Sequence, residues 1–271
     1  MTTLPRRLAG LLLVTTLAVL GLAACQPAFD AGGRTSSITK VSTSTVDGWR
    51  YDFYRNTAYP CAVSGYQTFT IATRVGSSPT ASRPLWVRMH GGGVGYFTSA
   101  GVVVPNTKQK VEEGPATQRS QLNGALVDDV RADAAGFRLL TVSMCDHDIY
   151  GGADIPDPNN PGTIPGGGPR TVNGLYATKA AVQFTLGAYP TSDYFLHGGS
   201  AGSYGSYHVA WSLQEQGIPP PAWWPTPGCS TRSGWRPWAT TPSAGAPPRP
   251  APRSPSACTP TSPTRPTSRT C

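Results

Sequence analysis

The sequence predicts an α/β protein built on a mostly parallel sheet that is incomplete at its C-terminal side. Short apolar stretches typical of buried strands alternate with longer stretches that have helical spacing. Clusters of glycine follow two of these expected strands, at residues 91–93 and 198–202. Because loops at the carboxyl ends of parallel strands carry the chemistry of α/β proteins, the two clusters mark a candidate site.

The expected elements lie between residues 49 and 217. Strands are expected at 49–54 and 67–75; in the second, apolar residues share one face at a period of two. In chain order there follow a strand at 84–89, a helix at 121–135, a strand at 137–144, a Gly/Pro/Asp-rich loop at 146–169, a helix at 171–188, a strand at 193–197 and a helix at 200–216.

Residues 1–24 have the layout of a signal peptide, with two arginines followed by about 13 mostly apolar residues. They end in Leu-Ala-Ala before Cys25, which resembles the lipobox of bacterial lipoproteins. That resemblance implies cleavage before Cys25, acylation of this residue, and anchoring in the cell envelope on the extracytoplasmic side of the membrane. The alternative is ordinary cleavage near Ala24, with Cys25 left as a free thiol.

The net charge of +8 comes from the two ends of the chain. Residues 221–271 hold six arginines and no acidic residue, whereas residues 25–220 hold 14 basic and 14 acidic residues. The middle of the chain is neutral, so the charge indicates no nucleic-acid partner. The apolar content of 38% is enough for a core and excludes disorder throughout. No run of about 18 apolar residues lies beyond the leader, which excludes several membrane spans.

Residues 25–48 are rich in Ser, Thr and Gly, and we expect them to form a flexible spacer before a domain at 49–220. Export to an oxidising compartment permits disulfides. Cys61 and Cys145 therefore either pair in a disulfide or stay as two buried thiols.

Two motifs follow expected strands directly: His-Gly-Gly-Gly at 90–93 and Gly-Gly-Ser-Ala-Gly at 198–202. In this order they resemble the oxyanion loop and the Gly-x-Ser-x-Gly nucleophile elbow of the α/β-hydrolase superfamily, over about residues 49–217. The alternatives are a helix N-cap for Ser200 and a plain glycine turn.

The resemblance implies acyl transfer with Ser200 as the nucleophile. It also implies an oxyanion hole made by the backbone N–H groups of Ala201 and of Gly92 or Gly93. By analogy with hydrolases of this superfamily we expect an ester-type small molecule or an acylated glycan as the substrate.

A narrower likeness is to the pectin-acetylesterase and carboxylesterase-like group. It rests on the segment 144–152, although Gly199 stands where that group usually has a cysteine. Because the loop would border the pocket, His90, Asp146 and Asp148 are candidates for shaping it. Five residues of the loop also partly match a calcium-binding template, but Tyr150 does not fit, and a solvated acidic turn is favoured. We expect no metal and no cofactor.

The catalytic triad does not close in the expected domain. In hydrolases of this fold an acid and then a histidine follow the serine along the chain. After Ser200 the sequence offers only His208 and Glu215, both on the helix that runs away from the elbow. The general base and the acid are therefore missing from the expected site.

Residues 221–271 contain no Leu, Ile, Val, Phe, Met or Tyr, and we expect them to be disordered. A natural Pro/Thr-rich linker is one interpretation, and an out-of-frame or truncated C-terminus is the favoured one. The two tryptophan codons of 223–224 are TGGTGG, and reading from one nucleotide upstream permits Leu-Val-Ala-Asp-Ser-Gly-Leu, an apolar strand and a turn. Resequencing the gene at codons 219–221 tests this; a shifted frame without a downstream acid and histidine would contradict it.

Two functions are compatible with the sequence. The first is an exported lipoprotein that resembles a serine carboxylic-ester hydrolase but is inactive in this chain, because acid and base are missing. The alternative is a non-catalytic surface lipoprotein with a binding or structural role. Both contact the membrane through the lipid on Cys25.

Overall fold

The computed structural model describes residues 34–106, 108–164 and 167–226, with side chains as far as Pro221. The expected leader, Cys25 and residues 227–271 lie outside this part of the chain. The strands are β1 (Ile38–Val46), β2 (Trp49–Pro60), β3 (Tyr66–Arg74), β4 (Arg83–Met89), β5 (Tyr96–Phe97), β6 (Val103–Val104), β7 (Arg138–Val142), β8 (Ile155–Pro156), β9 (Thr171–Val172), β10 (Thr191–Gly199) and β11 (Ala222–Thr226). The helices are α2 (Pro115–Ser120), α3 (Ala125–Ala132), α4 (Gly174–Ala188) and α5 (Ala201–Glu215). None of these helices is long and apolar enough to cross a membrane.

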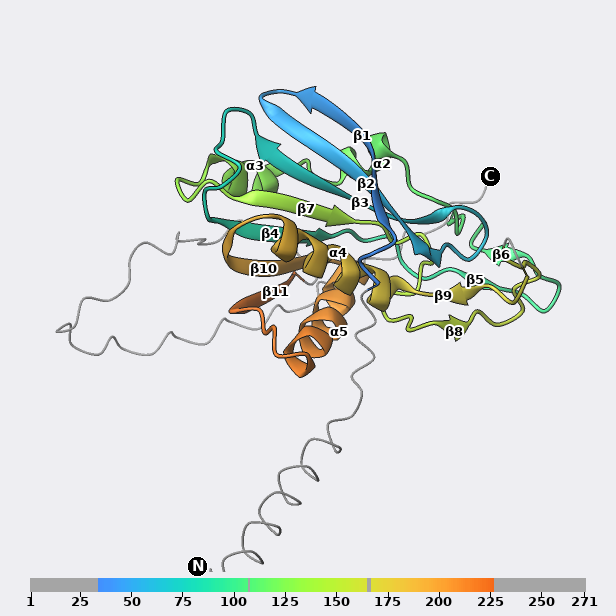
Figure 1. Ribbon diagram of the computed structural model, residues 1–271. Helices are drawn as coiled ribbons and strands as arrows, with labels where there is room; N and C mark the ends of the chain where they lie inside the picture. The colour runs from blue at the N-terminus through green and yellow to red at the C-terminus, as the bar shows by residue number, and fades with distance from the viewer. Residues whose placement is uncertain (1–33, 107, 165–166, 227–271) are drawn as a thin grey trace, which may run out of the picture. The chain divides into compact units, whose positions relative to one another are not determined.

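The main sheet has the spatial order β1-β2-β3-β7-β4-β10-β11 (Figure 1). The pairs from β1 to β7 are antiparallel, and the pairs from β7 through β4 and β10 to β11 are parallel. The predicted α/β class is confirmed, with a mixed sheet that is parallel in the half carrying the glycine motifs. The carboxyl ends of β4, β7 and β10 therefore meet at one edge.

A hairpin opens the sheet where a flexible spacer was expected. β1 lies within residues 25–48 and pairs with β2, with Val46 opposite Trp49. Asp47 and Gly48 form the two-residue turn with φ of 51° and 75°, as a type I′ hairpin turn requires. Most of β1 is exposed, which explains its polar composition, while its threonines suit a strand. The expected domain start at residue 49 is therefore corrected to Ile38.

The helix expected at 121–135 is shorter in the structure, where α3 covers only 125–132 and a separate helix, α2, comes before residue 121. Gly124 lies between them with φ of 110°, and a residue in that conformation cannot continue an α-helix. The buried face of α3 carries Val127 and Val130, whereas Ala125, expected on the apolar face, is exposed. The other expected helices correspond to α4 and α5, and the expected strands correspond to β2, β3, β4, β7 and β10.

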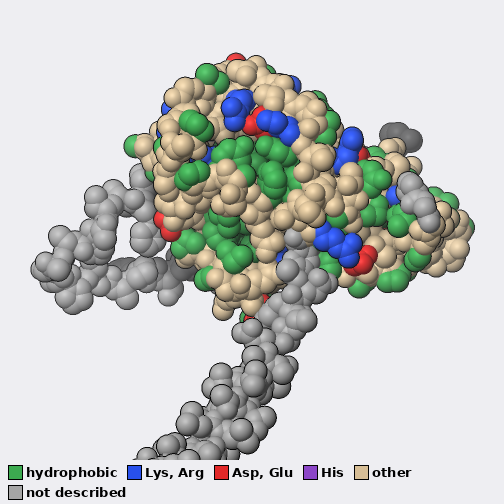
Figure 2. Space-filling view, in the orientation of Figure 1, with side chains coloured by type: hydrophobic (Ala, Val, Ile, Leu, Met, Phe, Trp, Pro, Cys, Tyr) green, Lys and Arg blue, Asp and Glu red, His purple; other side chains and the backbone are tan. Residues whose placement is uncertain are grey.

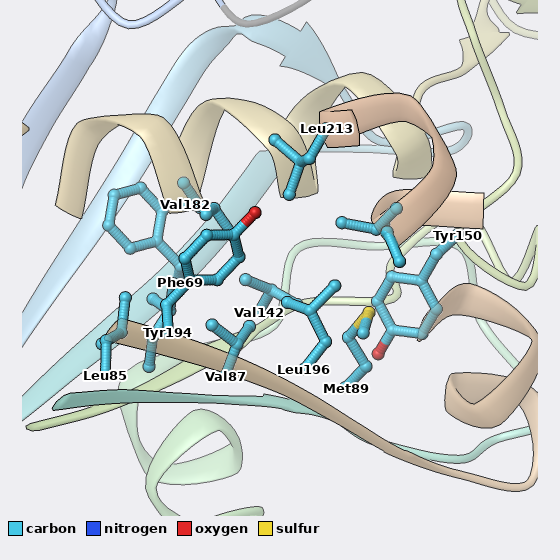
Figure 3. Packing of buried hydrophobic residues seen from close by; sticks show 14 of the residues in the cluster. Phe69, Leu85, Val87, Met89, Val142, Tyr150, Val182, Tyr194, Leu196 and Leu213 are labelled. Carbon is cyan, nitrogen blue, oxygen red and sulfur yellow. The ribbon is translucent and has the colours of Figure 1, made fainter. Parts of the chain in front are cut away.

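Hydrophobic side chains pack on both sides of the sheet. The larger cluster joins the central strands to α4 and α5, with Leu85, Val87 and Leu196 almost fully enclosed (Figure 3). On the other side, α3 packs against Trp86 and Leu139. Figure 2 shows further hydrophobic side chains at the surface of the face that carries α4 and α5. The α5 helix itself exposes three aromatic side chains, Tyr204, Tyr207 and Trp211.

The last described strand lies inside the segment expected to be disordered. β11 pairs in parallel with β10, from Phe195 opposite Ala222 to Gly199 opposite Thr226. β10 supplies backbone hydrogen-bond partners to this segment, and the composition of the segment alone does not indicate such a partner. The sheet therefore continues past residue 220 to Thr226, which corrects the expected boundary.

Candidate active site

Ser200 lies at the turn between β10 and α5. Its backbone has φ of 53° and ψ of −119°, a conformation that costs a non-glycine residue about 1–3 kcal/mol. A Cβ on Gly198 would lie 1.8 Å from the carbonyl oxygen of Gly202, and a Cβ on Gly202 would lie 2.1 Å from that of Met89. Close approach of the backbone therefore requires glycine at both positions. The turn has the strained strand-to-helix geometry of a nucleophile elbow, with Ser200 exposed.

The His-Gly-Gly-Gly segment lies beside Ser200, because β4 and β10 are parallel neighbours. A Cβ on Gly91 would lie only 3.6 Å from Ser200 Oγ. Gly92 and Gly93 follow Gly91 directly in the chain. The N–H of Ala201 is the first in α5, and such an N–H has no partner inside its helix. The fold thus brings the expected nucleophile and the expected oxyanion-hole segments together.

His90 lies beneath the oxyanion loop with its side chain only 7% exposed. Its Nδ1 is 2.8 Å from the carbonyl oxygen of Gly91, and its Nε2 is 3.1 Å from Oε2 of Glu113. Burial lowers the pKa of His90, but the hydrogen bond and the charge of Glu113 outweigh burial and raise this pKa above its ordinary value. The hydroxyl of Tyr150 donates to the carbonyl oxygen of His90 at 3.1 Å. His90 therefore supports the loop from below rather than facing a substrate.

Asp146 and Asp148 are also turned inward. The carboxylate of Asp146 is fully buried and accepts hydrogen bonds from the N–H of Ala62, the side-chain amide of Gln67 and the N–H of Asn173. Asp148 accepts from three backbone N–H groups on either side of the loop, at residues 150, 152 and 174. Burial, then repulsion from Asp148, raises the pKa of Asp146, and burial raises the pKa of Asp148. Both carboxylates fasten the loop to the body of the domain.

The first part of the loop after β7, residues 144–150, is therefore packed against the domain and is not the solvated acidic turn expected from the sequence, whereas residues 154–156 are exposed. The loop's other acidic side chains are bound to groups of the protein: Asp154 accepts a hydrogen bond from Thr171, and Asp157 forms an ion pair with the buried Lys110. Within the described residues no cluster of acidic, histidine or cysteine side chains is arranged to hold a metal ion. At the start of the loop, Cys61 and Cys145 are joined in a disulfide.

Two further histidines lie near the glycine motifs. A Cβ on Gly92 would lie 3.5 Å from Cε1 of His147, and burial lowers the pKa of His147 to about 4. His197 stacks on Trp86, with ring centroids 5.1 Å apart, and its Nδ1 accepts a hydrogen bond from Arg88 at 3.0 Å. Burial, then the charge of Arg88, lowers the pKa of His197 to about 3. Both rings are therefore neutral at pH 7.

The fourth histidine, His208, is exposed on α5. It lies near the loop after β7, where a Cβ on Gly151 would be 3.9 Å from its Nε2. In the described part of the chain no hydrogen bond joins a histidine to the hydroxyl of Ser200. The described residues thus contain the strained serine turn and the glycine loop expected to form the elbow and the oxyanion hole, but no histidine in contact with the serine hydroxyl.

Sequence reasoning missed Glu113, which lies before α2 and contacts His90. It also missed Lys108, whose Nζ donates to the carbonyl oxygen of Gly92. Few residues of this chain are charged, only 13%, so the local run of Lys108, Lys110, Glu112 and Glu113 was the available signal.

A central mixed sheet, a strained serine between strand and helix, and a glycine loop beside it agree with the α/β-hydrolase fold expected from the two motifs. No family model matches the chain, and no curated protein matches its sequence. Among solved structures it resembles brefeldin A esterase, a bacterial homologue of human hormone sensitive lipase, with 16% identity over 76% of this chain and 45% of that chain, at a TM-score of 0.34.

Two other similar structures are also esterases by name. A bacterial heroin esterase shares 17% identity over 76% of this chain and 47% of that chain, at a TM-score of 0.31. The rice cell wall degrading esterase LipA from Xanthomonas oryzae shares 12% identity over 65% of this chain and 44% of that chain, at a TM-score of 0.31. The chain spans less than half the length of each of these three proteins.

Proposed function

We propose that this chain carries the acyl-transfer half of a serine carboxylic-ester hydrolase site, on an exported protein anchored by a lipid on Cys25. The observation that carries the proposal is the backbone of Ser200, with φ of 53° and ψ of −119°, directly beside the glycine loop. A serine held in this strained turn presents its hydroxyl at the strand end, where an ester carbonyl can reach it.

The proposed chemistry is attack of Ser200 Oγ on the ester carbonyl carbon. The carbonyl oxygen gains negative charge and is stabilised by the N–H groups of Ala201 and of Gly92 or Gly93, each such donor contributing about 10²–10³ in rate. The bond between the carbonyl carbon and the alcohol oxygen breaks, and the alcohol leaves with the proton lost by the Ser200 hydroxyl. Water then attacks the acyl-serine, which releases the acid and restores the hydroxyl. The substrate class is an ester-type small molecule or an acylated glycan.

The same site supports little turnover in this chain, because attack requires a base that accepts the hydroxyl proton. His90 is paired with Glu113, and His197 stacks on Trp86. Among the described residues, neither His147 nor His208 forms a hydrogen bond with the Ser200 hydroxyl. A fluorophosphonate probe tests this, since it labels a serine only where a base activates the hydroxyl. We expect little or no labelling of Ser200; strong labelling that disappears in Ser200→Ala would contradict the proposed inactivity.

The second candidate, a non-catalytic surface lipoprotein, is favoured by the same lack of a histidine at Ser200 Oγ. The two functions differ in ester binding, because an intact oxyanion site stabilises a tetrahedral adduct and a remnant does not. The lipid anchor common to both is tested by metabolic labelling with a fatty acid. We expect wild-type protein to incorporate the label and Cys25→Ala to lose it; equal labelling of both would contradict the anchor.

A further inference from the structure

Two peptide groups of the glycine loop have their carbonyl oxygens held by nitrogen donors. The ring of His90 is 2.8 Å from the carbonyl oxygen of Gly91, and the ammonium group of Lys108 donates to that of Gly92. In a trans peptide the C=O and the following N–H point in opposite directions. The N–H groups of Gly92 and Gly93 therefore point away from these donors. They are the loop groups proposed to bind the oxyanion.

The protonation of His90 follows from its two neighbours. Nδ1 faces a carbonyl oxygen and Nε2 faces a carboxylate oxygen of Glu113, and both of these atoms only accept hydrogen bonds. Each ring nitrogen must therefore carry a hydrogen, which makes the ring an imidazolium. The ion pair is shielded from solvent, since the two side chains are 7% and 14% exposed. In such surroundings a charge-assisted hydrogen bond is strong.

Glu113 is itself fixed by two further donors. Its Oε1 accepts from the N–H of Met144 at 3.1 Å, and its Oε2 accepts from the side-chain amide of Gln118 at 2.9 Å. One carboxylate thus ties the end of β7 and the helix α2 to the residue that precedes the three glycines. The other charged or titratable groups that face His90 are Arg88 from β4, Tyr150 from the loop after β7, and His147 across Gly92.

We propose that Glu113 is a positioning residue for the oxyanion hole: it keeps His90 charged, and the charged ring holds the Gly91 carbonyl so that the Gly92 N–H is aimed at the substrate oxygen. The inference rests on the proposed function, because it assigns this role within the same site. Glu113 touches neither substrate nor reacting atoms. Its effect is on the rate of acylation, through the placement of one peptide group.

The chain offers a matched control in the neighbouring residue. Glu112 lies in the same segment and is 20% exposed, but its carboxylate binds Arg55 and the N–H of Tyr66. Glu112→Gln therefore removes a charge and weakens a more exposed ion pair without touching the glycine loop. A difference between Glu113→Gln and Glu112→Gln reports on the loop.

The test uses a nucleophile that needs no general base. In the full chain carrying Ser200→Cys, the few per cent of thiolate present at about pH 7 attacks p-nitrophenyl acetate. Its sulfur bonds to the acetyl carbon, the carbon–oxygen bond breaks, and p-nitrophenolate leaves with the electron pair. Mass spectrometry of the peptide that contains the substituted position follows acetylation at this thiol alone. The reference is the same protein unfolded in urea.

We expect acetylation of the introduced thiol to be faster in the folded than in the unfolded protein. Addition of Glu113→Gln should slow it by about 10-fold to 100-fold, as misplacement of a catalytic group does, while Glu112→Gln should leave it unchanged. Glu113→Asp, which keeps the charge, should recover part of the loss. A fast parent with equal rates for Glu113→Gln and Glu112→Gln would overturn the positioning role alone. A parent no faster than unfolded protein would overturn the proposed function and this inference together.

A second measurement needs no variant, and so decides the matter even if Glu113→Gln does not fold. The ring signals of His90 in the NMR spectrum of the wild-type protein report its protonation. We expect the pKa of the ring to lie above the ordinary histidine value of about 6.5, so that the ring is mostly doubly protonated at about pH 6.5. A neutral ring at that pH would overturn the proposal.

Discussion

Replacement of both Cys61 and Cys145 by alanine should lower the free energy of unfolding by about 4–5 kcal/mol. The two cysteines are 84 residues apart, and the chain-entropy relation for a loop of that length gives this value at 25 °C. Both side chains are buried, at 0% and 1% exposure, so alanine creates a small cavity but no unsatisfied polar group. The total free energy of unfolding of a small domain is about 5–15 kcal/mol, so the expected loss is a large fraction of the stability.

Equilibrium urea denaturation of the wild-type and the doubly substituted protein measures this loss. The native contacts should survive, because Asp146 accepts a hydrogen bond from the N–H of Ala62 at 2.8 Å, next to the disulfide. Wild-type protein unfolded and refolded with a reductant should lose as much stability as the double variant. A loss below about 1 kcal/mol would refute the reasoning, since it would mean that the unfolded chain is not restrained by the cross-link.

Two further predictions concern a glycine pair and a buried histidine. Gly198→Ala should prevent stable folding, because its Cβ would lie 1.8 Å from a backbone oxygen. Gly187→Ala in α4, whose Cβ meets nothing within 4 Å, should instead stabilise the protein by about 0.5–1 kcal/mol. Thermal melts compare the two variants, and equal effects would contradict the steric account. His197 has a pKa lowered to about 3, so its contribution is present above about pH 6.5 and is lost as the pH falls towards 3. The raised pKa of Asp146 changes stability with pH in the opposite direction, so the measurement compares wild type with His197→Gln at each pH. The difference between their free energies of unfolding should fall by about 2–3 kcal/mol from pH 6.5 to 4.5. A difference that does not change with pH would contradict the neutral ring.

The sequence predicted the parts of the fold that depend on local pattern. Buried strands such as β4 and β7 are short apolar runs, and both glycine motifs lie at strand ends as expected. The strain at Ser200 follows from its glycine neighbours. β1 was missed because an exposed edge strand has the composition of a linker, although the Asp47-Gly48 turn was a readable hairpin signal.

The supports of the candidate site could not be predicted in the same way. Asp146 is an acid in a Gly/Pro-rich loop, a pattern that normally indicates exposure. Its burial depends on donors from Ala62 and Gln67, more than 70 residues earlier in the chain. Glu113 likewise acquires its role from a contact with His90 across 23 residues. Such contacts are created by the sheet order, so a local reading of the sequence does not contain them.

The sheet order also has a consequence for synthesis, which delivers the chain from its N-terminus. β7 lies between β3 and β4, yet it is made after both of them. Until Arg138–Val142 emerges, β3 and β4 each present an unpaired strand edge, and unpaired edges invite association with other chains. Over the same interval Cys61 is a thiol without its partner, open to exchange with any disulfide nearby. The nascent half of this domain therefore keeps two open strand edges, which favour aggregation, until one five-residue strand emerges and pairs with both.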